Sequence, residues 1–415
     1  MTTQMQGAQP DAETAAEPTG HPAIQVKHLT KIYPTRGGEA SHGWPWSKKS
    51  AENKAKAAAD DVNFSVAKGE FFVIMGLSGS GKSTVLRMLN RLVEPTSGEL
   101  LIDGRDVATM PEADLRELRN RKINMVFQHF ALFPHRTVRD NAAYALHVRH
   151  ESEAKRNERA DWALKTVGLG DWGDHLPGEL SGGMRQRVGL ARALASDADI
   201  LLMDEPFSAL DPLIRRDMQD LLMTLQAELH RTVVFVTHDL NEAMRMGDRI
   251  MIMRNGAVVQ LGTAQEILNT PADDYVTEFI SDVDRSRVLT AEAIMQEPLV
   301  TATADDPPEA VLAKLSNVEG VGAYVLNADG GIVGVTRADL LAAGVGQQRK
   351  ALGQLTTQEY EAVPADTPLQ DICALVGRNS VPLAVVDPNG KLLGVVPRAT
   401  LLAALATPKK DEVEA

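Results

Sequence analysis

The residues Gly76–Thr84 have the composition and spacing of a phosphate-binding loop, reading Gly-Leu-Ser-Gly-Ser-Gly-Lys-Ser-Thr. Glycines carry no Cβ, so the backbone can fold closely round a polyphosphate with its N–H groups pointing inward. We expect Lys82 to reach the β- and γ-phosphates of a nucleotide and the Ser83 hydroxyl to hold Mg²⁺. The alternative is a glycine-rich turn that matches by chance. The residues predicted to bind the phosphates are Gly76, Ser78, Gly79, Ser80, Gly81, Lys82, Ser83 and Thr84.

Two carboxylates and a histidine follow other apolar runs, as expected of a hydrolytic site. Asp204 and Glu205 come directly after Ile200–Met203, and His238 follows Val233–Thr237. Asp204 is placed to bind magnesium, and Glu205 to orient a water molecule for attack on the γ-phosphate. A lone histidine is usually structural, but this one stands at a strand end, as the two carboxylates do.

A second anion site is predicted where Leu180–Gln186, reading Leu-Ser-Gly-Gly-Met-Arg-Gln, opens a helical run. The Ser181 hydroxyl and the amides of Gly182 and Gly183 would lie at the positive end of that helix. Taken singly, a Ser-Gly-Gly triplet is usually structural. Its place in order with the other motifs favours a phosphate site.

The apolar and helical segments next to these residues predict an α/β fold. The apolar run Phe71–Met75 precedes the phosphate-binding loop, and the helical segment Val85–Leu89 leaves it. Continuous apolar runs of this length are typical of buried parallel strands. A further strand is predicted at Ile123–Phe127, and residues 136–170 have a charged, helical pattern.

The composition describes a large acidic chain. It has 415 residues, 44% of them apolar, a net charge of −13 and a pI of about 5.3. The length suits two or three domains, and the acidity argues against nucleic acid as a partner. The single cysteine, Cys373, fits a reducing compartment. Because no apolar run approaches the roughly 20 residues of a membrane-spanning helix, we expect a soluble cytoplasmic chain. Residues 1–22 are polar and are predicted to form a disordered tail.

In this order the motifs resemble those of the nucleotide-binding subunit of an ABC transporter, over about residues 24–280. The resemblance implies a P-loop NTPase domain at residues 23–285, with a mixed sheet core, a helical signature subdomain and an insertion at 37–59. It implies an ATPase that uses ATP and Mg²⁺. By the resemblance, Tyr33 stacks on adenine, and Gln128 contacts the metal and signals to the membrane subunit. Asp204 binds the metal, and the catalytic residues are Glu205, His238, Gln128 and Asp211. The signature residues that contact the nucleotide are Ser181, Gly182, Gly183 and Gln186. Met184 departs from the usual glutamine but leaves the triplet intact.

The resemblance also implies partners. The phosphate-binding loop and the signature of one chain face different ways, so a complete site needs a head-to-tail homodimer. The other implied partners are an integral membrane permease subunit and an extracellular or periplasmic solute-binding protein. This chain would then be peripheral, on the cytoplasmic face of the inner membrane. The apolar patch Phe130–Pro134 is the predicted seat of the permease.

The subfamily is indicated by the insertion 37–59 and by four segments, Met184–Leu190, Met203–Glu205, Asp211–Arg215 and His238–Met244. They resemble the ATPase subunit of glycine betaine/L-proline (quaternary amine) importers, which implies the import of a compatible solute. One alternative is an importer ATPase for another small solute, such as methionine or a polyamine. Another is a soluble ABC protein acting on ribosomes or DNA, which the acidic charge disfavours.

An internal repeat of about sixty residues occupies the last third of the chain, since Val325–Val335 is similar to Val385–Val395. The two units resemble tandem CBS domains, an α+β pair at residues 286–345 and 350–407, and residues 408–415 form an acidic tail. Such a pair would regulate transport. Residues 287–415 hold ten Lys/Arg and sixteen Asp/Glu, a net charge of 10 − 16 = −6. This favours sensing of ionic strength, with binding of an adenine nucleotide at Thr336 and Asp339 as the alternative.

Overall fold

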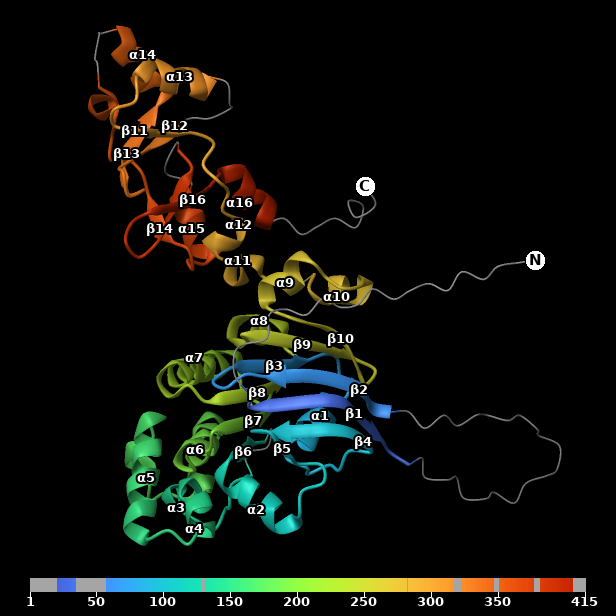
Figure 1. Cartoon of the computed structure of the whole chain (residues 1–415). Coiled ribbons are helices and arrows are strands. Elements are labelled where there is room, and N and C mark those ends of the chain that lie inside the picture. The colour runs from blue at the N-terminus through green and yellow to red at the C-terminus, as the bar shows by residue number, and fades with distance from the viewer. Residues whose placement is uncertain are drawn as a thin grey trace, which may run out of the picture. The chain divides into compact units, whose positions relative to one another are not determined.

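The computed structural model describes residues 21–34, 57–127, 131–281, 283–316, 322–346, 351–376 and 381–405. The chain forms two compact units, Met1–Leu261 and Gly262–Ala415 (Figure 1). The predicted tails 1–22 and 408–415 lie almost wholly outside the described residues, and so does most of the insertion 37–59. The last three residues of that insertion belong to a strand, because Ala57 and Ala59 pair with Ile32 and Lys31.

A six-stranded sheet forms the centre of the first unit, with the order β10-β9-β3-β8-β7-β6. The neighbours β9/β3, β3/β8, β8/β7 and β7/β6 are parallel. Every residue of β3, β7 and β8 is buried, which accounts for the apolar runs Phe71–Met75, Ile200–Met203 and Val233–Val236 within them. The strands are β3 (Phe71–Met75), β6 (Ile123–Val126), β7 (Ile200–Asp204), β8 (Thr232–Thr237), β9 (Arg249–Arg254) and β10 (Ala257–Gly262).

A second, antiparallel sheet of the same unit has the order β2-β1-β4-β5. One apolar core joins the two sheets, and helix α1 (Lys82–Leu89) contributes Val85, Leu86, Met88 and Leu89 to it. The predicted mixed sheet core is therefore confirmed. The strands of this second sheet are β1 (Ile24–Ile32), β2 (Ala57–Val66), β4 (Ser97–Ile102) and β5 (Arg105–Asp106).

Helices make up the rest of the first unit. Helices α3 to α6 gather into one group beside the sheets, where α6 packs on α3, α4 and α5 (Figure 1). This group is the predicted helical subdomain. The helices are α2 (Glu112–Arg121), α3 (Val138–Ala142), α4 (Tyr144–Val148), α5 (Glu153–Thr166), η1 (Gly170–Trp172), η2 (Pro177–Glu179), α6 (Gly182–Ala195), α7 (Pro212–Leu229) and α8 (Leu240–Met246).

The second unit contains the repeat as two three-stranded sheets, β11-β12-β13 and β14-β15-β16. Each has one parallel and one antiparallel pair, and Val325↔Gly334 in the first sheet corresponds to Val385↔Gly394 in the second. The first repeat holds β11 (Thr301–Thr303), α13 (Pro308–Ser316), β12 (Gly322–Leu326), β13 (Ile332–Arg337) and α14 (Ala338–Gly346). The second holds β14 (Ala362–Pro364), α15 (Leu369–Val376), β15 (Leu383–Val386), β16 (Leu392–Val396) and α16 (Arg398–Leu405).

The two repeats exchange the segments with which they begin. The first repeat begins with α11 (Arg285–Val288) and α12 (Ala291–Ile294), yet Ala291 N–H donates to Thr367 O of the second repeat at 2.9 Å. Conversely, the second repeat begins with η3 (Leu352–Leu355), which contributes Leu352 and Leu355 to the core of the first. Between the sheets, the Tyr324 hydroxyl donates to Pro382 O at 2.6 Å. The repeats are thus one interlocked pair.

Two helices, α9 (Ala264–Asn269) and α10 (Asp274–Phe279), group with this second unit. Gln265 of α9 donates to the Thr290 hydroxyl at 3.2 Å, and Arg285 donates to Leu268 O at 3.3 Å. Our predicted ATPase domain extends to residue 285 and therefore includes these helices.

Candidate functional site

The predicted catalytic residues meet at one edge of the six-stranded sheet. Strands β3, β8 and β7 are adjacent and parallel, so their carboxyl ends lie together. The phosphate-binding loop follows β3, Asp204 ends β7 with Glu205 directly after it, and His238 follows β8. Carboxyl ends of strands are where parallel α/β sheets hold their ligands.

The loop can be built only with glycine at two positions. A Cβ on Gly76 would lie 2.2 Å from Met253 O, and a Cβ on Gly81 would lie 2.2 Å from Ala58 O. Gly81 also has a φ of 104°, in the left-handed region that favours glycine. The Ser80 Oγ is buried and has no hydrogen-bond partner among the described residues. The loop thus has a closely packed backbone and a buried hydroxyl oxygen that could bind a phosphate.

Lys82 is buried at the base of this loop, 5% exposed. Its ammonium group donates to Gly76 O at 2.8 Å and to Leu77 O at 3.1 Å. Burial lowers the pKa of Lys82, while the nearby carboxylates of Glu205 and Asp204 act in the opposite direction. A desolvated cation among backbone amides is a strong site for phosphate.

The two groups predicted to hold Mg²⁺ are in direct contact. The Ser83 hydroxyl donates to Asp204 Oδ1 at 2.7 Å, and the Asp204 carboxylate is 6% exposed. Its other oxygen, Oδ2, accepts from Arg87 Nη2 at 3.0 Å. A hydroxyl and a carboxylate oxygen suit Mg²⁺, which prefers oxygen ligands. Sequence reasoning did not identify Arg87, which lies one helical turn beyond Ser83 and so faces the same carboxylate.

Glu205 and His238 form the other contact pair of the site. His238 Nδ1 lies 3.0 Å from Glu205 Oε2. Glu205 has a φ of 46°, although it is not glycine, and its N–H donates to Val236 O at 3.0 Å. The left-handed backbone costs about 1 kcal/mol or more, and such strain is often found at functional sites.

The signature lies at the start of α6, in the helical subdomain. Ser181 caps this helix, its Oγ accepting from Met184 N–H at 3.3 Å. Gly183 is buried against α7, since a Cβ there would lie 2.7 Å from Ile214 Cγ2. Gln186 is also buried, 1% exposed, and its Oε1 has no partner among the described residues. Since Gln186 is buried inside its own chain, its position does not support the predicted contact with a nucleotide. Ser181 is exposed, so its position is compatible with such a contact.

The remaining predicted residues have other placements. Tyr33, 46% exposed, follows β1, and the Lys31 ammonium lies 5.2 Å from its ring centroid. Asp211 caps α7 and accepts from Ile214 N–H at 3.1 Å. Gln128 and Phe130, the latter in the predicted permease seat, lie outside the described residues.

The two predicted regulatory residues do not present their polar groups together. The Thr336 hydroxyl is fully buried and donates to Leu355 O at 2.9 Å, which ties β13 to η3. Asp339 is exposed and pairs with Arg337 at 3.1 Å. Neither contact supports a nucleotide site.

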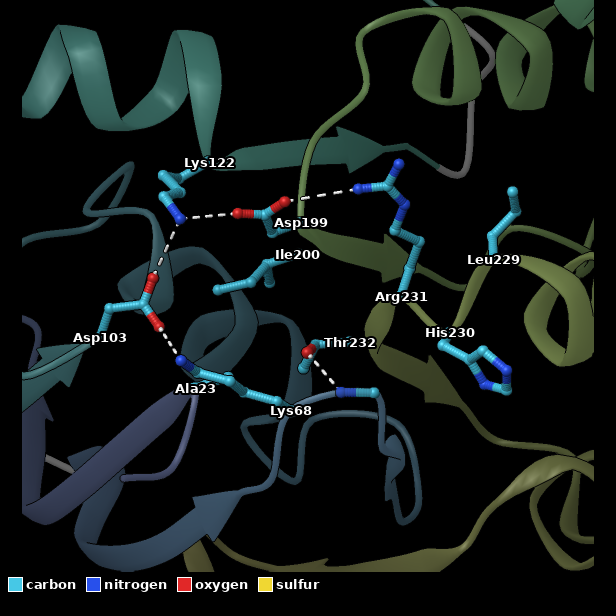
Figure 2. A pocket seen from close by; sticks show the side chains of 11 residues that line it. Ala23, Lys68, Asp103, Lys122, Asp199, Ile200, Leu229, His230, Arg231 and Thr232 are labelled. Carbon is cyan, nitrogen blue, oxygen red and sulfur yellow. Dashed lines mark hydrogen bonds and ion pairs between the residues drawn. The ribbon is translucent and has the colours of Figure 1, made fainter. Parts of the chain in front are cut away.

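A cavity of about 210 Å³ lies at the amino ends of the parallel strands, and Figure 2 shows the side chains that line it. Its lining residues Gly69, Lys122, Asp199 and Arg231 come shortly before strands β3, β6, β7 and β8. Lys122 bridges Asp199 at 2.6 Å and Asp103 at 3.2 Å, and Arg231 pairs with Asp199 at 3.4 Å. Since Asp103 belongs to the turn between β4 and β5, these ion pairs tie the two sheets together.

Two protein-family models and many known proteins are similar to this chain. The family model described as "ABC transporter" matches residues 59–208, and that described as "CBS domain" matches residues 291–345 and 352–407. The glycine betaine/proline betaine transport system ATP-binding protein of Escherichia coli (strain K12) is 49% identical over 389 residues, covering 92% of this chain and 97% of that protein. The glycine betaine/carnitine transport ATP-binding protein of Listeria monocytogenes serotype 1/2a (strain 10403S) is 44% identical over 387 residues, with coverage of 92% and 97%. This chain belongs to the ABC transporter ATP-binding proteins, in the group of the betaine transport proteins.

The predicted resemblance, with its tandem CBS domains, is therefore confirmed. A solved dimeric ATP-binding cassette, in a post-hydrolysis state with ADP and phosphate bound, superimposes with a TM-score of 0.51 at 37% identity and covers 58% of this chain and 98% of that one. The chain is thus an ATP-hydrolysing subunit of a membrane transporter. None of its described helices is long and apolar enough to cross a membrane.

Proposed function

We propose that two copies of this chain, joined head to tail, drive the import of a quaternary amine such as glycine betaine or proline betaine. The observation that carries the head-to-tail pairing is the split site, and the solute class is supported by the similarity to the betaine transport proteins. The phosphate-binding loop, Asp204, Glu205 and His238 meet at one sheet edge, whereas Ser181 caps an exposed helix start in the other subdomain. A second chain would bring its Ser181–Gly183 to the γ-phosphate bound by the first.

Each contact of the site supports one part of ATP hydrolysis. The loop amides and Lys82 would bind the β- and γ-phosphates, the lysine exchanging its two carbonyl partners for phosphate oxygens. Ser83 and Asp204 would hold Mg²⁺, which when bound neutralises charge on those phosphates. Glu205 would orient the attacking water and accept its proton, and His238 would keep the carboxylate in place.

The partners follow from this function. A membrane permease subunit would contact the chain, and a solute-binding protein outside the membrane would deliver the solute. The chain would lie on the cytoplasmic face of the cell membrane, with Tyr33 stacking on adenine. We place Gln128 near the metal and the permease seat at Phe130–Pro134, both by resemblance alone.

The CBS pair would restrain transport at low ionic strength. Its net charge of −6 supports an electrostatic mechanism, because screening of exposed charges grows as salt rises. The alternative, an adenine nucleotide at Thr336 and Asp339, is weakened because the Thr336 hydroxyl already has a buried partner.

The test is uptake into liposomes that contain this chain with its permease and its solute-binding protein. We expect ATP-driven uptake of radiolabelled glycine betaine, unaffected by excess methionine or spermidine and absent with the Glu205→Gln variant. Uptake of methionine or a polyamine in place of betaine would overturn the proposed solute class.

A further inference from the structure

A carboxylate that the nucleotide site does not use is buried beside it. Glu242, in the first turn of α8, is 6% exposed. Its Oε2 accepts from the Thr237 hydroxyl at 2.6 Å, and its Oε1 accepts from Gln219 Nε2 at 3.0 Å. Arg215 Nε lies 3.9 Å from the same Oε1. A buried carboxylate is costly unless its oxygens are satisfied, so this arrangement is specific.

The hydrogen bonds around Glu242 are satisfied by a carboxylate with two acceptor oxygens. The Thr237 Oγ accepts from Asp239 N–H at 3.0 Å, and its one proton is donated to Glu242 Oε2. The Gln219 Oε1 accepts from Arg245 at 3.2 Å, which leaves its amide nitrogen for Glu242. A glutamine at this position would place an NH₂ group against one of these donors.

These bonds hold the backbone on both sides of His238. Thr237 precedes the histidine and is tied to Glu242 through its hydroxyl. Asp239 follows it, and its Oδ1 accepts from Asn241 N–H at 2.9 Å and from Glu242 N–H at 3.3 Å. His238 itself reaches Glu205 at 3.0 Å. The imidazole therefore projects from a segment that is held on one side by the Glu242 carboxylate, through Thr237, and on the other by the backbone N–H groups of α8, through Asp239.

Arg215 extends the same network to the segment after Glu205. Its Nη2 donates to Leu210 O at 3.1 Å, and its Nη1 lies 3.4 Å from Asp239 Oδ2. Leu210 immediately precedes Asp211, which begins α7. One guanidinium thus touches the segment before α7 and the residue that follows the histidine.

We propose that Glu242 is a positioning residue for ATP hydrolysis, holding His238 against Glu205 and, through Arg215, tying the segment Leu210–Asp211 to the histidine. Its side chain contacts Thr237, Gln219 and Arg215 and none of the residues that we expect to hold nucleotide or metal, so its effect is on the rate of hydrolysis rather than on ATP binding. The part that concerns Leu210–Asp211 rests on the proposed head-to-tail arrangement, in which that segment faces the second chain.

The test is a double-mutant cycle on ATP hydrolysis by the full-length chain. Glu242→Gln should lower kcat about tenfold, a barrier increase of ~1.4 kcal/mol, with the KM for ATP within about twofold of wild type. In the His238→Ala background, the same substitution should cost less than about twofold, because its effect is exerted through the histidine. Glu266→Gln, on α9 of the other unit, is the matched control and should leave kcat unchanged.

Two outcomes would overturn the proposal. The first is a kcat within about twofold of wild type for Glu242→Gln. The second is a double variant whose fold reduction of kcat equals the product of the reductions in the two single variants. If Glu242→Gln does not fold, Thr237→Val removes the linking hydroxyl with little change of shape, and the same expectations apply to it. Hydrolysis is measured without the permease, so a wrong solute class leaves this test intact.

Discussion

At the scale of single residues, the phosphate-binding loop depends on the absence of two side-chain carbons. We predict that Gly81→Ala lowers ATP affinity at least about tenfold and destabilises the fold by several kcal/mol, because its Cβ would lie 2.2 Å from Ala58 O at a φ of 104°. Gly104→Ala is the matched control, since its φ is 75° with open space around the Cβ position. It should cost only about 1 kcal/mol. Equal losses for the two variants, by ATP titration and urea unfolding, would show that the close contact is unimportant.

A second residue-scale prediction concerns the protonation of Lys82. Burial sets its folded pKa below the unfolded value of 10.5. Between those two values the unfolded chain binds more protons, so the free energy of unfolding rises with pH. Relative to Lys82→Met, which has no such group, the wild type should gain stability as pH approaches 10.5 from below. Urea titrations of both proteins across the alkaline range would check this, and a constant or falling difference would contradict it.

Many site residues could be predicted from sequence because local patterns define them. Gly76–Thr84, Asp204, Glu205 and His238 each stand at a strand end, and parallel strands bring such ends together. Arg87 and Glu242 could not be found in this way. Arg87 meets a carboxylate 117 positions away, and Glu242 depends on Gln219 and Arg215 of another helix. Such contacts arise from tertiary packing, which no local pattern encodes.

At the scale of elements, the start of α6, which carries the signature, approaches the start of α7 at one point, where Gly183 lies beside Ile214. Gly183 allows this approach, because a Cβ there would lie 2.7 Å from Ile214 Cγ2. We predict that Gly183→Ala displaces the start of α6 and lowers ATPase activity at least about tenfold, and that the added change Ile214→Ala, which removes the clashing methyl group, restores most of it. Ile214→Ala alone serves as the control. A Gly183→Ala defect that persists fully in the double variant would place its cause at the nucleotide instead.

The repeat shows where prediction of elements succeeds and where it stops. The strands and glycine turns of both units recur with the predicted period, Gly334 and Gly394 occupying equivalent positions. The exchange of α11–α12 and η3 between the repeats was not predicted. Both segments are short, and only the cores that they fill, such as that holding Leu352 and Leu355, determine where they dock.

At the scale of the whole molecule, the two compact units allow the regulatory role to be separated from hydrolysis. Removing residues 285–415 cuts the second unit between α10 and α11, and it takes away the interlocked CBS pair but keeps α9 and α10. We predict that transporter membranes carrying this truncated chain hydrolyse ATP at all salt concentrations, whereas the full chain becomes active only as salt rises. The Debye length falls from ~10 Å at 0.1 M to ~3 Å at 1 M, which sets the range of the series. An identical salt dependence for the two chains would remove the sensing role.

The central claim is that Glu205 activates water in a site that two chains complete, and one variant tests both halves. Steady-state hydrolysis and the molar mass in solution should be measured together for Glu205→Gln with ATP and Mg²⁺ present. We predict retained ATP binding, a turnover reduced at least about a hundredfold, and a stable dimer that wild type forms only transiently. Turnover within about threefold of wild type, a barrier change of only ~0.6 kcal/mol, or a chain that stays monomeric while ATP is bound, would contradict the account.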